Sequence, residues 1–149
     1  MGLKEKLQSD LTQAIRSRDE LQSGTIRMLL AAITNEEVAG KAAKVLSDAE
    51  IISVLSREAK KRREAVEAYT QAKREDLANK EKAEAAVIAH YLPKQLSEGE
   101  IKKLIQEAIK STGAAGPSGM GLVMKQLQPK IAGKADGGLV SALVKAALA

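Results

Sequence analysis

Apolar residues recur at helical spacing along almost the whole chain of 149 residues, and they rarely alternate as they would in a β-strand. Between Ile101 and Ile109, for example, they occupy positions i, i+3, i+4, i+7 and i+8, which is one face of a helix. The sequence has two tyrosines and neither phenylalanine nor tryptophan, so its core must consist of aliphatic side chains. Strands favour aromatic and β-branched residues, so we predict an all-α protein.

Helix-capping signals and one proline predict how these helices are grouped. Ser47 and Ser97 are each followed three residues later by glutamate, the pattern of a capping box at a helix start. Pro93 lies between these two boxes; it has no N–H to donate, and it disfavours helical geometry in the residue before it. We therefore predict an N-terminal four-helix bundle over residues 1–93 and a C-terminal three-helix bundle over residues 94–149.

Positive charge is concentrated in the smaller C-terminal part. Residues 1–93 contain 16 Lys and Arg against 15 Asp and Glu, whereas residues 94–149 contain 8 Lys against 4 Asp and Glu. The C-terminal part has no arginine, and lysine suits contact with phosphate better than bidentate reading of bases. It also has no aromatic residue on which the bases of a single strand could stack. If a nucleic acid binds here, we expect a folded RNA that is recognised by its shape and phosphates.

Residues 128–138 form the most unusual segment, with three glycines, a proline and two lysines before the last helix. Pro129 is expected to end the sixth helix and Asp136 to cap the seventh. One interpretation is an anion site at the N-terminus of the seventh helix, where backbone N–H groups can hold a phosphate. The other is a tight turn in which Asp136 itself occupies those N–H groups, and spacing alone favours this second interpretation.

Residues that could support catalysis or metal binding are few. The chain has no cysteine, and His90 is its only histidine, which disfavours metal binding and nucleophilic triads. Glu58 and Glu84 could meet only if several helices brought them together, so we expect both on solvated faces. We predict that the chain is not an enzyme and has no cofactor, metal or small-molecule substrate.

The basic run over residues 60–63 could form a second patch for a polyanion. Acidic residues at positions 58, 64 and 67 dilute its charge, and Glu58 can pair with Arg62 one helical turn away. We therefore expect this run, including Arg62, to be a solvated helix face.

Two features predict a cytoplasmic protein. No apolar run approaches the ~18 residues that a membrane span requires. The first residues also lead into an amphipathic helix and contain no apolar core of a secretory signal.

Three segments of the sequence resemble the GatB/YqeY family. They are Tyr91-Leu92-Pro93-Lys94-Gln95-Leu96-Ser97, the stretch from Met120 to Gly137 with its spaced glycines, lysines and proline, and the run from Ile26 to Ile33. The resemblance extends over essentially the whole chain. It implies two all-helical bundles, in agreement with the periodicity.

The family includes free-standing bacterial proteins and the tail of the B subunit of the tRNA-dependent aspartyl/glutamyl amidotransferase, which helps to hold tRNA. The resemblance therefore implies a tRNA-binding module in translation that lacks the catalytic domains of that carbon–nitrogen ligase. The candidate RNA-contacting residues that it implies are Lys125, Lys130, Gly133, Lys134, Asp136 and Gly137. With the resemblance included, the anion site and the tight turn are about equally favoured. An alternative is a protein-interaction module that docks onto an aminoacyl-tRNA synthetase or an amidotransferase.

Overall fold

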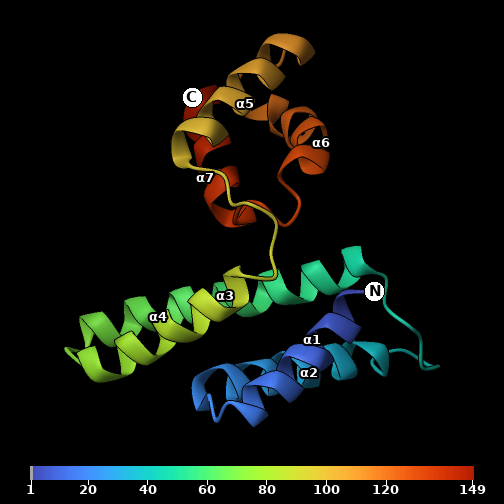
Figure 1. Ribbon diagram of the computed structural model, residues 1–149. Coiled ribbons are helices and arrows are strands. Elements are labelled where there is room, and N and C mark those ends of the chain that lie inside the picture. The colour runs from blue at the N-terminus through green and yellow to red at the C-terminus, as the bar shows by residue number, and fades with distance from the viewer. Residues whose placement is uncertain (1) are drawn as a thin grey trace. The chain divides into compact units, whose positions relative to one another are not determined.

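The computed structural model describes residues 2–149 and confirms the all-α prediction: within these residues there are seven α-helices, one 3₁₀ helix and no strand (Figure 1). The chain divides into two compact units, Met1–Leu92 and Pro93–Ala149, which we call the first and second unit. The first contains α1 (Leu3–Arg16), α2 (Glu20–Glu37), α3 (Asp48–Gln71) and α4 (Glu75–Ala89). The second contains α5 (Glu98–Thr112), η1 (Pro117–Gly119), α6 (Met120–Ile131) and α7 (Gly137–Leu148).

In the first unit, α1 packs mainly on α2 and α3 mainly on α4 (Figure 1). The Ser47 side chain and Glu50 form the capping box that begins α3. After α4, the Tyr91 hydroxyl donates a 2.6 Å hydrogen bond to the Asp10 carboxylate of α1. This bond joins the first helix to the end of the unit. The core is aliphatic apart from Tyr91, and its largest buried members are Leu7, Ile26, Leu29, Ile33, Ile51, Leu55 and Ile88.

Lys60, Lys61 and Arg63 are exposed, as expected for a solvated face. The expectation is wrong for Arg62, which is only 5% exposed and lies between two carboxylates. Its Nη1 donates to Glu58 Oε2 at 2.5 Å, and its Nε lies 3.5 Å from Glu84 Oε2 on α4. Packing of α3 against α4 therefore brings together Glu58 and Glu84, which the sequence placed on separate solvated faces. A buried guanidinium needs such partners, since an uncompensated buried charge is costly.

This ion-pair cluster predicts that the first unit loses stability in acid. Burial alone would raise the pKa of Glu58, but hydrogen bonds and charge from Lys61 and Arg62 outweigh burial and lower that pKa below 4.5. The unfolded chain therefore takes up the proton first, so the stabilisation is complete above about pH 4.5 and declines as pH falls through the folded pKa. We expect the urea midpoint to fall between pH 6 and pH 3.5, and to fall less steeply in Glu58→Gln. If the urea midpoint fell equally with pH in the unmodified chain and in Glu58→Gln, the acid sensitivity could not be assigned to Glu58.

In the second unit, α5, α6 and α7 all contact one another. Ser97 caps α5, since its hydroxyl accepts the Glu100 N–H at 3.2 Å, and Gly113 ends this helix in the left-handed conformation. The buried core residues are Ile101, Ile105, Ala108, Val123, Leu127, Ile131, Val140, Val144 and Leu148.

Pro129 does not stop the sixth helix as expected, because α6 continues to Ile131 with the proline in its last turn. At this position the proline removes a single N–H near a helix end, where few bonds remain to be disrupted. Helical bonding resumes beyond it, since the Ala132 N–H donates to the Gln128 carbonyl at 3.1 Å. Ile131 is buried in the core and holds this last turn in place.

Candidate nucleic-acid interface

The link between α6 and α7 is a tight turn centred on Gly133. Gly133 has φ of +71°, a left-handed conformation that glycine adopts without the steric penalty of other residues. The next two N–H groups, of Lys134 and Ala135, turn back to the Ile131 carbonyl at 2.8 and 3.2 Å. The turn is therefore closed by its own backbone, and the glycine allows it to form.

Asp136 and Gly137 form the start of α7. The Asp136 carboxylate accepts the Leu139 N–H at 3.2 Å, so Asp136 is the N-cap that the sequence suggested. Gly137 is the first helical residue and is exposed, with no atom near the position of a Cβ. Because a carboxylate already occupies this helix end, a phosphate placed there would meet negative charge. Of the two interpretations of this segment, the geometry matches the capped turn.

The three predicted lysines are exposed. Lys125 lies on α6, Lys130 is in the last turn of α6, and Lys134 follows Gly133 in the turn. Among residues 2–149, none of the three forms an ion pair with a carboxylate. Lys130 also complements the negative end of the α6 dipole. These ammonium groups are therefore available to an external anion.

The segment before α5 is bonded to this turn, which the sequence reasoning did not anticipate. The Gln95 side-chain amide donates to the carbonyls of Pro93 and Gly133, both at 2.8 Å. The Leu96 N–H donates to the Lys134 carbonyl, also at 2.8 Å. These bonds place the exposed Lys94 beside the turn. We call this turn (residues 129–138) together with residues 93–97 the lysine turn.

Sequence reasoning missed Lys94 and Gln95 as site residues because 38 residues separate Gln95 from Gly133. The available signal was the Pro93-Lys94-Gln95 stretch, which carried the family resemblance but was interpreted only as a boundary between bundles. Nothing in helical periodicity indicates that two loops are bonded to each other.

The chemistry available at the lysine turn is that of binding. Lys94, Lys130 and Lys134 offer ammonium donors to phosphate oxygens, and Asp136 is the only acidic residue after Glu107. The second unit contains no histidine, cysteine, arginine or aromatic residue in its sequence. It therefore has no histidine base or thiol nucleophile, and no platform for base stacking.

These features define a class: an all-helical protein of two compact units, the second of which carries exposed lysines around a closed glycine turn. The particular family follows from comparison with known proteins. A family profile described as Yqey-like protein matches residues 4–148. The chain therefore belongs to the YqeY-like family.

Several fungal proteins are similar in sequence. "Altered inheritance of mitochondria protein 41, mitochondrial" of Pyrenophora tritici-repentis is 34% identical over 134 residues, covering 87% of this chain and 71% of the relative. The protein of the same name in Candida glabrata is 30% identical over 128 residues, covering 84% of this chain and 68% of the relative. An uncharacterized protein of Schizosaccharomyces pombe is 31% identical over 97 residues, covering 64% of this chain and 76% of the relative. Neither the family description nor these names state an enzymatic activity.

The relatives correct the expected location. Proteins similar to this chain are named as mitochondrial, so the prediction of a cytoplasmic protein is wrong. They are fungal, whereas the resemblance implied bacterial proteins. The features on which the prediction rested, a charged first helix and the lack of long apolar runs, do not distinguish one aqueous compartment from another. Among the described residues, no helix combines the length and apolarity that crossing a bilayer requires.

Proposed function

We propose that this protein is a non-catalytic tRNA-binding module and that the lysine turn contacts the RNA backbone. The observation that carries the proposal is the set of exposed lysines, Lys94, Lys130 and Lys134, which hydrogen bonds between two distant segments gather around Gly133. Clustered lysines contact phosphates without reading sequence, so the RNA is recognised by the positions of its phosphates. Lys125, five residues before Lys130 on α6, is a further exposed lysine of the same helix.

Transfer RNA is favoured over other folded RNAs by the resemblance of the sequence to the amidotransferase tail. The amidotransferase tail that the sequence resembles helps to hold tRNA while catalysis takes place in other domains. The second unit likewise has lysines but no histidine or cysteine. We infer that the chain presents tRNA to a partner, such as an aminoacyl-tRNA synthetase or an amidotransferase, and carries out no chemistry itself.

The salt dependence of tRNA binding tests this function. Each lysine–phosphate contact releases condensed counterions, so three contacts should weaken binding roughly 40-fold between 50 and 200 mM salt. We expect a gel shift or fluorescence anisotropy titration with total tRNA to show this decline. A duplex DNA of equal charge should bind more weakly at both salt concentrations. Binding that is insensitive to salt, or equal for DNA and tRNA, would contradict the proposal.

A further inference from the structure

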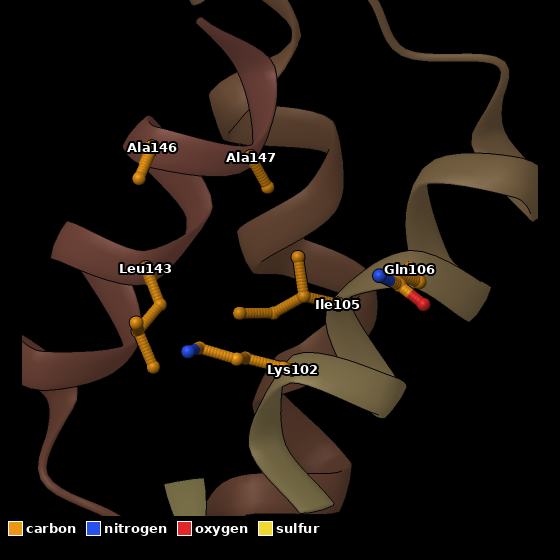
Figure 2. A pocket seen from close by; sticks show the side chains of 6 residues that line it. All are labelled: Lys102, Ile105, Gln106, Leu143, Ala146 and Ala147. Carbon is orange, nitrogen blue, oxygen red and sulfur yellow. The ribbon is translucent and has the colours of Figure 1, made fainter. Parts of the chain in front are cut away.

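A groove runs between α5 and α7 of the second unit (Figure 2). It has a volume of about 340 Å³. Its lining residues are Lys102, Ile105 and Gln106 from α5, and Leu143, Ala146 and Ala147 from α7. Ile105 forms the floor and is only 1% exposed, while the two alanines are exposed on the wall. The hollow exists because methyl groups leave unfilled the space that larger side chains would occupy.

The groove lies on a side of the α5–α7 pair that no other helix of the unit covers. α6 contacts both α5 and α7 but contributes no residue to the lining. Leu139, one turn before Leu143 on α7, is 42% exposed and extends the apolar strip along that helix. A further helix laid along this strip would complete a four-helix arrangement, the packing in which facing apolar strips bury one another.

The charge at the groove edge indicates what kind of helix fits. In Figure 2 the Lys102 side chain extends towards Leu143 along the groove. Its ammonium pairs with Glu98 at 3.1 Å, but both side chains are more than half exposed, so the pair is weak and can exchange partners. The unit as a whole is basic, with eight lysines against four carboxylates. If a second copy of this chain docked groove to groove, Lys102 of one copy would face Lys102 of the other, and the two charges would repel. A helix that carries carboxylates would instead be attracted to Lys102.

We propose that this groove is a docking site for an acidic amphipathic helix of a partner protein. The helix places apolar side chains at spacing i, i+4 and i+7 over Ile105, Leu143 and the two alanines, and a carboxylate beside Lys102. This inference goes beyond the proposed function, because it assigns a particular surface, outside the lysine turn, to the binding of a protein partner.

The groove and the lysine turn can be tested separately because they share no residue, although Lys102, at the near end of the groove, follows Ser97 of the lysine turn by only five residues. Gly137, at the lysine turn, and Ala146 are nine residues apart on α7, which is about 14 Å along a helix axis. We therefore expect a helix bound at the Ala146 end of the groove to leave Lys130 and Lys134 accessible to RNA.

The test uses the full chain and a synthetic peptide of 15 residues, with leucines at spacing i, i+4 and i+7 and glutamates elsewhere on its surface. We expect the peptide to bind with micromolar affinity and to shift the backbone NMR signals of residues 102–106 and 143–147. Lys102→Glu should weaken peptide binding at least tenfold. Lys103→Glu, which makes the same charge change on an exposed neighbour that does not line the groove, should weaken it less than threefold. Ala147→Gln, which fills the groove without charge, should also weaken it tenfold.

Three outcomes would overturn the proposal. They are equal effects of the two lysine variants, no signal shifts in the groove at millimolar peptide, and displacement of the peptide by a poly-uridine oligonucleotide, which would assign the groove to RNA. Binding of tRNA, measured on the same variants, separates this proposal from the proposed function. Lys102→Glu and Ala147→Gln should each change tRNA affinity less than threefold, so either proposal can fail alone.

Discussion

Replacing Arg62 with alanine is expected to lower the free energy of unfolding of the first unit by about 3–5 kcal/mol. The arginine is buried between Glu58 and Glu84, which are themselves largely buried. Removing the guanidinium takes away the cation that lies between the two carboxylates, while Lys61 still donates to Glu58 at 3.1 Å. The loss can be measured by urea denaturation followed by circular dichroism. Because the second unit has its own core, we expect its unfolding transition to be unchanged.

Arg57 provides the matched control for this prediction. It lies on the same helix and forms an ion pair with Glu36 at 3.1 Å, but both side chains are well exposed. Solvent screens such pairs, so Arg57→Ala should change the free energy of unfolding by less than about 1 kcal/mol. A further variant, in which Glu58, Arg62 and Glu84 all become methionine, should recover most of the stability lost in Arg62→Ala. If Arg62→Ala were no more destabilising than Arg57→Ala, the cluster would not have the structural role inferred from its burial.

Reversal of two charges at the lysine turn is expected to reduce tRNA affinity on the order of 100-fold at 100 mM salt, because two phosphate contacts are lost and two repulsions are added. The variant is Lys130→Glu with Lys134→Glu. Both side chains are exposed and unpaired within the described residues, so the second unit should remain folded. Its salt dependence should also become shallower, since each lost contact removes about 0.9 from the slope of log affinity against log salt.

Lys110→Glu with Lys145→Glu is the control for this variant. It changes the net charge of the same unit by the same amount, and these lysines lie in the last turns of α5 and α7, just as Lys130 lies in the last turn of α6. Any loss of helix-dipole stabilisation is therefore similar in kind. We expect less than a fivefold loss of tRNA affinity in the control. A comparable loss in both variants would indicate a diffuse positive field and would argue against a localised site.

Sequence patterns predicted the local features of this fold well. The helical class is confirmed, and so are the capping box at Ser47 and the N-cap at Asp136. Ser97 is confirmed as an N-cap, without the backbone bond to Glu100 that would complete its box. Such features depend on residues within one helical turn of each other, so their signal is contained in short stretches of sequence. The end of α6 was misplaced because the effect of a proline depends on how near it lies to the helix terminus, and buried Ile131 draws the helix two residues further.

Long-range partners of charged residues were not predictable in this way. Arg62 continues the buried stripe of α3, three residues after Ala59, so helical spacing distinguishes it from its basic neighbours; only the approach of α4 shows that it faces Glu84. The bond from Gln95 to Gly133 is similar, because both residues lie in loops without periodicity. Nor did the location of the protein follow from apolar content; it was the named relatives that corrected the cytoplasmic prediction.

The sequence by itself determined that this chain is helical, where most of its helices begin, and that its surplus of lysine lies after Pro93. These properties follow from backbone hydrogen bonding and side-chain period, which act between near neighbours in the chain. The tertiary structure alone decided which charges are buried in pairs, which lysines are gathered around Gly133, and where α5 and α7 leave an open groove. Those properties arise when packing brings distant segments into contact, and the free energy of burial then depends on partners that no local pattern specifies.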